Sequence, residues 1–420
     1  MDDDKPNGHT EEQSANGHAE EQGAGRLSSG EDSWYLPDDE SWHDEPGYNP
    51  DVAKALRAAH QHLIGGSLMA YLEAFNSIAG ILDAEMSRRQ RLAVLFIAAL
   101  ALAADDPPTP ALEAIDEALD IALDLEVERA QEDLLLLRAS VNHAIEQVPD
   151  AAEDLRQCLE LITVQSESRD LTPTELDTRL EAFLRLAGFE FLIGHYDRAG
   201  QLLDRAATLI PRVPQNTKAP FLLAWTRALL LRWRGEYELA LTQAMEAADG
   251  YAIHGPPGTE GRIRSIVGEI ALDLAERCQH NHQPVACAAF LALAEPYIID
   301  AAALAASDDH TATEMMALIT NCRLQLLKGE VNSVERISWL EELAGRGAEK
   351  QDPAIVAQAY TQIGREYEAQ GDIPAAKHWY QRALAHLKES QMAALGVWAQ
   401  RALWRLGGEM GPDDGPDDYL

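Results

Sequence analysis

Short breaks recur along this chain at a nearly constant distance, and they restrict its fold more than any other feature. Glycines at Gly194, Gly235, Gly329 and Gly371 separate segments whose apolar residues have helical spacing. The first two glycines are 41 residues apart and the last two 42, and the 94 residues between the pairs contain a further break at 279–284. A fixed period of this size is typical of helical hairpins that stack and bury their faces on their neighbours.

Helical patterning runs from residue 51 to residue 407 and predicts an all-α solenoid of roughly seven or eight hairpins. Hydrophobic residues make up 46% of the chain but aromatic residues only 6%, and this favours helices over sheets. The segment Met392–Leu406 supplies one more helix, which we expect to cap the last hairpin. Residues 1–50 and 408–420 are acidic and lack apolar periodicity, so we expect disordered tails.

The clearest hairpin spans residues 182–211, where Gly194 separates two amphipathic helices. Small residues, Ala187, Ala199 and Ala206, stand where the two helices must approach closely. This stretch resembles a tetratricopeptide repeat. The period of 41 to 47 residues is longer than the roughly 34 of the standard repeat, so the helices or loops must be longer.

Two further copies also resemble the family. The copy nearest the C-terminus has the family's spacing of large and small residues at Tyr360, Ile363, Gly364, Tyr367, Gly371, Asp372, Ala376, Tyr380 and Ala383. The other has Gly235, Glu236, Tyr237 and Ala240, but carries Arg227 where the family prefers a large apolar residue. The resemblance implies a right-handed superhelical solenoid of tetratricopeptide-like hairpins.

The resemblance also implies a binding surface. In tetratricopeptide solenoids the first helix of each hairpin lines a concave groove, which binds an extended peptide or a helix of a partner protein. In this register the expected groove residues are Trp225, Arg232, Trp233, Arg323, Thr361 and Arg365. Arginines beside aromatic residues suit a partner that offers carboxylates and apolar anchors. Alternatively, Trp225 and Trp233 pack between hairpins.

The end of the acidic N-terminal segment forms a candidate linear motif. Aromatic and apolar residues stand among acids there: Trp34, Tyr35, Leu36, Trp42 and Tyr48. This pattern is typical of a segment that folds onto a partner. The same residues could instead pack on the chain's own first helices, or enter the groove of the same or a neighbouring molecule and cause self-association.

The charge and the cysteines bear on partners and location. A net charge of −36 repels nucleic acid phosphate and anionic lipid, so we expect neither as a direct partner. Four cysteines are too few for a disulfide framework and favour a reducing, cytoplasmic location. The segment Met86–Ala104 mimics a signal peptide, but its apolar run is too short for a membrane span and fits a buried helix.

A zinc site is the strongest chemical alternative. Four potential ligands lie close together, Cys278, His280, His282 and Cys287, but their spacing matches no common zinc module. The chain has no nucleotide-binding glycine loop and no nucleophile motif, so we expect no cofactor and no catalytic residues. A metal-dependent enzyme is therefore the less favoured hypothesis.

These observations together predict a non-catalytic scaffold or adaptor that binds a partner peptide or helix in its groove. The alternative is a regulatory sensor whose superhelix responds to a peptide or a small ligand, with the effector on another chain.

Overall fold

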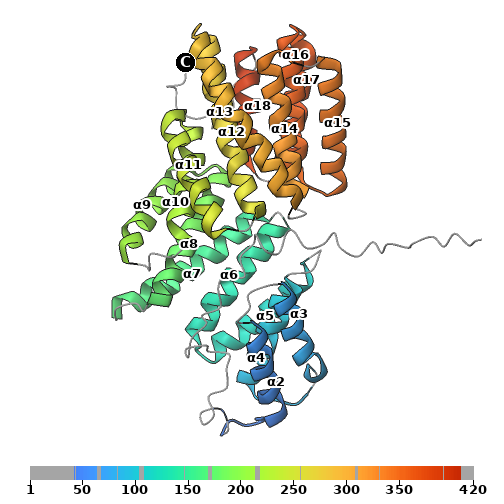
Figure 1. Ribbon diagram of the computed structural model, residues 1–420. Helices are drawn as coiled ribbons and strands as arrows, with labels where there is room; N and C mark the ends of the chain where they lie inside the picture. Colours follow the sequence, from blue (N-terminus) through green and yellow to red (C-terminus); the bar gives the residue numbers. More distant parts are fainter. Residues whose placement is uncertain are drawn as a thin grey trace, which may run out of the picture. The chain divides into compact units, whose positions relative to one another are not determined.

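A computed structural model describes Trp42 and residues 44–63, 68–82, 84–103, 108–145, 147–168, 173–212, 218–255, 257–307, 311–330, 332–390 and 392–407. Within these ranges it contains seventeen α-helices and two short 3-10 helices, and no strand (Figure 1). The predicted all-α class is confirmed. The chain divides into two compact units, Met1–Leu125 and Glu126–Leu420. The helical spacing is the same on both sides of this division, so periodicity alone does not reveal it.

The first unit is built around one apolar helix. It contains α2 (Pro50–Leu63), α3 (Leu68–Ile78), η1 (Ala79–Ile81), α4 (Arg88–Leu102) and α5 (Pro110–Asp124). Helix α4 packs against the other three α-helices. Its residues from Leu92 to Ala101 are all buried, as expected for a helix that is apolar on every side. The apolar part of the signal-like segment thus lies in α4, the core helix of this unit.

The start of α4 is fixed by a polar network. Ser87 and Gln90 form a capping box, in which the Ser87 side chain accepts from the Gln90 backbone N–H and the Gln90 side chain accepts from the Ser87 N–H. Gln90 also exchanges two hydrogen bonds with the Asn49 backbone, at 2.9 and 2.7 Å. These bonds tie the residues just before α2 to α4.

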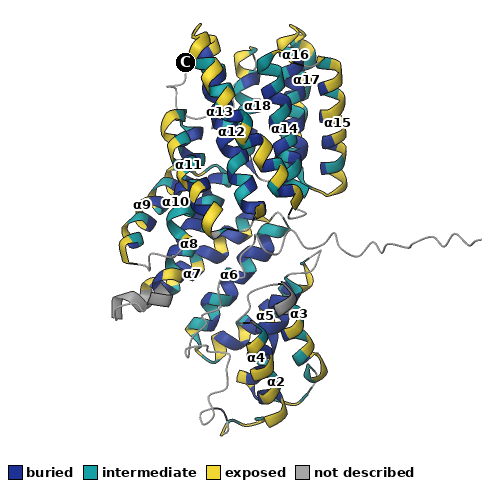
Figure 2. Cartoon of the chain, in the orientation of Figure 1, coloured by how far each residue is buried: buried dark blue, intermediate teal, exposed yellow. Residues whose placement is uncertain are grey.

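The second unit is a series of helical hairpins. Its helices are α6 (Glu128–Ala144), α7 (Val148–Ser168), α8 (Pro173–Ile193), α9 (Tyr196–Leu209), η2 (Ile210–Arg212), α10 (Ala219–Trp233), α11 (Tyr237–His254), α12 (Pro257–His280), α13 (Pro284–Ser307), α14 (Thr311–Lys328), α15 (Ser333–Glu349), α16 (Pro353–Ala369), α17 (Ile373–Ser390) and α18 (Ala393–Arg405). Consecutive helices pack pairwise, and the first helices of successive hairpins also touch, α8 on α10 and α14 on both α12 and α16. Figure 2 shows exposed positions along the outer helix α15.

Several predicted turns contain a residue with positive φ, which ends the first helix of the hairpin. Gly194 and Gly371 adopt φ of 103° and 80°, a region that an L side chain rarely enters, and end their helices. At the 279–284 break, His282 takes φ 58° instead of a glycine, so this repeat has the turn without its sequence signature. Pro149 does not interrupt a helix: α7 begins at Val148, and Pro149 lies in its first turn, where a missing N–H costs little.

A close helix contact joins α16 and α17. Tyr380 is fully buried, and a Cβ atom added at Gly364 would lie only 2.6 Å from its ring. Glycine at this place lets the two helices approach while the tyrosine fills the space between them. This pair is part of the sequence pattern that resembled the tetratricopeptide family.

One described helix, α13, is long and apolar enough in length and composition to cross a membrane. Its buried residues Ala294, Ile298, Ala301 and Ala305 lie four, three and four positions apart, which places them on one stripe of the helix. Helix α13 packs against α12 and α14. It therefore occupies the position of an ordinary second helix in a hairpin.

Candidate partner-binding pocket

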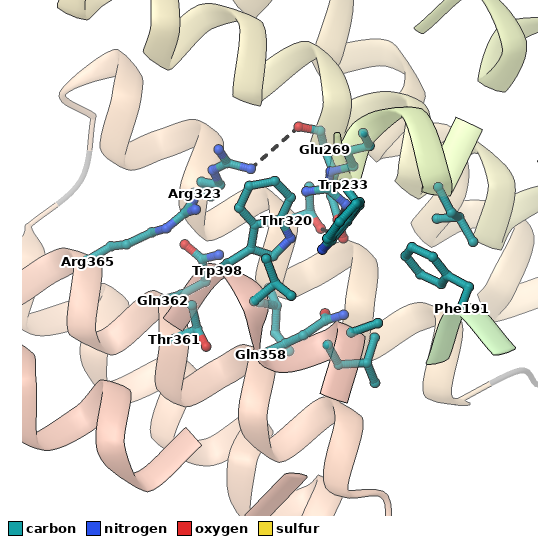
Figure 3. A pocket seen from close by; sticks show the side chains of 16 residues that line it. Phe191, Trp233, Glu269, Thr320, Arg323, Gln358, Thr361, Gln362, Arg365 and Trp398 are labelled. Carbon is teal, nitrogen blue, oxygen red and sulfur yellow. Dashed lines mark hydrogen bonds and ion pairs between the residues drawn. The ribbon is translucent and has the colours of Figure 1, made fainter. Parts of the chain in front are cut away.

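The second unit contains a pocket on the inner side of its hairpins (Figure 3). The pocket encloses about 800 Å³ of empty space, part of it open to solvent. Its walls come from α8, α10, α12, α14, α16 and α18. The lining residues are Phe191, Leu229, Arg232, Trp233, Glu269, Ile319, Thr320, Arg323, Gln358, Thr361, Gln362, Arg365, Ala394, Leu395, Val397 and Trp398.

Five of the six predicted groove residues line this pocket: Arg232, Trp233, Arg323, Thr361 and Arg365.

Trp225 does not line the pocket. It lies two turns before Arg232, about 10 Å along α10 at 1.5 Å per residue. There its ring meets Tyr251 edge-on, with centroids 6.1 Å apart, and Arg262 stands 5.6 Å from its centroid. Trp225 thus packs between hairpins, which was the alternative interpretation.

The predicted arginines are held by carboxylates of α12. The Arg232 Nε donates to Asp273 Oδ2 at 2.6 Å, and its Nη1 pairs with Glu269. Arg232 and Asp273 are 8% and 5% exposed, so the pair is shielded from water. Burial acts to lower the pKa of Arg232, but the two carboxylates outweigh burial and raise it.

Arg323 and Arg365 complete the network. The Arg323 Nη2 lies 2.7 Å from Asp273 Oδ1 and 2.8 Å from Glu276 Oε2, and Arg365 Nη1 lies 3.2 Å from Glu276 Oε1. Burial acts to raise the pKa of Asp273 and Glu276, but the neighbouring arginines outweigh it and lower both values. Three arginines from α10, α14 and α16 thus face three carboxylates of one helix, and their charges balance.

This balance corrects one expectation from the sequence. Arg232, Arg323 and Arg365 were expected to offer their charge to carboxylates of a partner, whereas the chain's own acids already neutralise them. The missed signal is the spacing of Glu269, Asp273 and Glu276, four and three residues apart, which puts three acids on one face of α12. Such a stripe inside a repeat indicates internal ion pairs.

An aromatic group forms one side of the pocket. Trp233 stacks on Tyr196 with centroids 3.6 Å apart, and Phe191 meets Tyr196 edge-on at 5.6 Å. Burial raises the pKa of Tyr196 to about 12, so its phenol is neutral at physiological pH. Trp398 of α18 also lies among the side chains that line the pocket (Figure 3). The sequence predicted α18 as a cap but did not predict its part in the pocket.

Amide side chains supply the uncharged polar groups. Gln358 and Gln362 lie four residues apart on α16 and both line the pocket. The Gln362 Oε1 is buried and has no hydrogen-bond partner in the described structure. A buried acceptor without a partner costs free energy, so a donor from a ligand would be stabilised there. The Thr361 hydroxyl already donates to the Ala357 carbonyl at 2.7 Å.

The candidate linear motif is described only in part. Trp34, Tyr35 and Leu36 lie outside the described residues. Trp42 is 5% exposed and Tyr48 is half-buried. These two side chains are therefore shielded from solvent, and the structure describes residues 44–50, where the sequence had predicted disorder.

The zinc hypothesis gains no support from the structure. Cys278 is 6% exposed and packs in the interior, while His280 and His282 are exposed on the turn. Across the ranges that the structure describes, no three His, Cys, Asp or Glu side chains converge as a metal site. Cys287 is half-buried, and burial raises the pKa of its thiol.

Comparisons with known proteins bear on the fold. No family model and no curated protein sequence matches the chain. The apo form of the quorum sensor NprR from B. thuringiensis is similar in structure, with a TM-score of 0.53 and 12% identity over 80% of this chain and 87% of that one. A Rap protein complexed with Competence and Sporulation Factor gives a TM-score of 0.51 and 12% identity, over 85% of this chain and 95% of that one. The predicted tetratricopeptide-like repeat fold is confirmed.

Proposed function

We propose that this chain is a non-catalytic protein-interaction module, which binds a short segment of another protein in the pocket of its second unit. The observation that carries the proposal is the pocket itself, whose walls come from six helices spread over most of the unit. The solenoid already holds these helices in place, so a ligand binds without the scaffold having to fold.

The lining determines what kind of segment would bind. Because the arginines are neutralised internally, the pocket recognises apolar side chains through Phe191, Leu229 and Trp233, and hydrogen-bonding groups through Gln358 and Gln362. An uncharged segment with an aromatic or aliphatic anchor meets these requirements. A strongly acidic segment does not, since the whole chain carries a net charge of −36.

Two similar structures support a ligand-binding role for this fold. One of them is a Rap protein in complex with a factor, and the other is described as a quorum sensor. The chain could also act as a sensor, in which binding changes the superhelix. A ligand that contacts helices of several repeats at once would stabilise one particular spacing between those repeats. A small-angle X-ray scattering measurement with and without ligand distinguishes a sensor, whose radius of gyration changes, from a rigid adaptor.

The experiment uses a displayed library of random 12-residue peptides, selected on the immobilised full chain. Selected peptides are then measured by calorimetry against a pocket variant, Gln358→Ala with Gln362→Ala. The matched control is Gln201→Ala with Gln381→Ala, the same change at two exposed positions on α9 and α17. Two lost hydrogen bonds of about 1 kcal/mol each predict a loss of affinity of roughly thirtyfold in the pocket variant.

The control variant is expected to bind like the wild type. A selection that yields no specific peptide, or peptides that bind the pocket variant and the control equally well, would refute the proposed site.

A further inference from the structure

Helix α18 does more than cap the last hairpin. A cap needs contacts only with its neighbours, and α18 has these with α16 and α17. It also packs against α8, a helix near the other end of the same unit. The contact with the early hairpins is specific, because Arg401 Nη2 donates to the carbonyl oxygen of Trp233 at 2.7 Å.

The chemistry of this contact explains why an arginine is there. Trp233 is the last residue of α10, and the final carbonyl groups of a helix have no partner within the helix. The C-terminal end of a helix also carries partial negative charge, which favours a cation. Arg401 supplies both the hydrogen-bond donor and the positive charge, although it lies 168 residues further along the chain than Trp233.

A second residue of α18 reaches the charged network. The Trp398 ring centroid lies 5.0 Å from the guanidinium carbon of Arg232 and 5.0 Å from that of Arg401. Both distances are within the range of a cation–π interaction. Arg232 thus contacts Trp398 while it is also paired with Glu269 and Asp273.

Four residues of α18 also line the pocket: Ala394, Leu395, Val397 and Trp398. They fill space on the inner side of the solenoid that would otherwise belong to the groove. An aromatic anchor and an arginine three residues later are thus supplied by the chain itself.

We propose that α18 is a built-in occupant of the groove, a latch that holds the C-terminal end of the unit against α8 and α10. A partner segment that takes the place of Trp398 releases the latch. The inference rests on the proposed function in one respect, that the groove is a binding site, and adds a competitor inside the same chain.

The latch has a quantitative consequence. A tethered segment competes at an effective concentration in the millimolar range, so it excludes a weak ligand in solution almost completely. Weakening the contacts of α18 therefore strengthens the apparent binding of any segment that uses the same place.

The test uses a fluorescein-labelled synthetic peptide of residues 392–407 as the probe, with anisotropy as the readout. The full chain with Trp398→Ala and Arg401→Ala keeps Arg232 and the Trp233 carbonyl but loses the latch contacts. We expect this variant to bind the peptide at least tenfold more tightly than the wild type does. The same peptide carrying both substitutions should bind neither protein.

The matched control is Trp404→Ala, the same change on the same helix at a side chain that is 38% exposed. It should bind the probe like the wild type. Hydrogen exchange provides the second measurement: amides of α18 should exchange faster in the double variant and at the wild-type rate in the control. If the double variant fails to give a native helical circular dichroism spectrum, Arg401→Gln alone replaces it and should show the same two changes to a smaller degree.

Two results would overturn the latch. Unchanged exchange in α18 would show that Trp398 and Arg401 do not hold the helix. Faster exchange without tighter peptide binding would show that α18 is a cap and not an occupant of the groove. Peptides selected from the random library would remain dependent on Gln358 and Gln362 in either case, so the proposed function would stand or fall separately.

Discussion

Replacing Asp273 by asparagine should destabilise the second unit strongly. Its carboxylate is 5% exposed and accepts from Arg232 at 2.6 Å and from Arg323 at 2.7 Å. The change keeps the size of the side chain but leaves two buried guanidiniums one negative charge short. Because the charges of the network balance in the wild type, the variant would carry a net positive charge in the interior.

The magnitude follows from these contacts. Removing one partner of a buried ion pair costs about 3–5 kcal/mol. Arg232 keeps Glu269 and Arg323 keeps Glu276, so we expect the lower end, about 3 kcal/mol. With a urea dependence of about 3 kcal/mol per molar, the midpoint of unfolding falls by about 1 M.

The assay is urea unfolding followed by tryptophan fluorescence, which reports on Trp233 and Trp398 beside the network. The control is Asp204→Asn, the same change in an exposed pair with Arg227, whose expected effect is below about 1 kcal/mol. A free energy of unfolding for Asp273→Asn within about 0.5 kcal/mol of the wild type would refute the reasoning.

The effect also depends on pH. The pKa of Asp273 is lower in the folded chain than its ordinary value, so the carboxylate stabilises the fold above about pH 4. This contribution is lost as the pH falls through the lower folded value. The difference between wild type and Asp273→Asn should therefore be constant from about pH 5 to pH 8 and shrink below about pH 4.

Two further substitutions and one thiol-labelling reaction test the packing. Gly364→Ala should destabilise the second unit by about 1–3 kcal/mol in urea unfolding, because its new methyl group would overlap Tyr380. Ser87→Ala removes the capping box of α4 and should cost about 1 kcal/mol, measured in the same way. In the native protein, a thiol-reactive dye should label Cys287 first, whereas Cys322, buried and with its pKa raised to about 11, should react only on unfolding.

Matched controls exist for these changes. Gly188→Ala on α8 meets no atom within 4 Å and should stabilise its helix by about 0.5–1 kcal/mol. Ser77→Ala changes a serine inside α3 that caps no helix, and should not destabilise the first unit. Destabilisation by either control, or early labelling of Cys322, would contradict the packing described above.

The repeat architecture was predictable because it depends on residues that are close together in the sequence. Turn glycines such as Gly194 and Gly371 require a backbone that other residues avoid, and the apolar spacing around them is helical. Where a non-glycine residue adopts the same backbone, as His282 does, the motif disappears although the hairpin remains.

The sequence indicated which residues line the pocket better than it indicated their ion pairs. The register of first helices assigned Arg232, Arg323 and Arg365 to the groove, and all three line the pocket. Their partners are on α12, at separations of 37 to 89 residues in the sequence, and no local pattern reports such pairing. Trp398 was missed for the same reason, since its neighbours in space come from helices far away in the chain.

The bond between Arg401 and the Trp233 carbonyl also bears on how this array unfolds. In an open array each repeat contacts only its neighbouring repeats. The terminal repeats therefore unfold first, and the total stability is a sum of contributions from single repeats and from the interfaces between neighbours. Here the final helix is fastened to an early hairpin, 168 residues back. Loss of the last repeat then weakens this early hairpin as well, and the closed array should unfold more cooperatively, and fold more slowly, than an open row of the same hairpins.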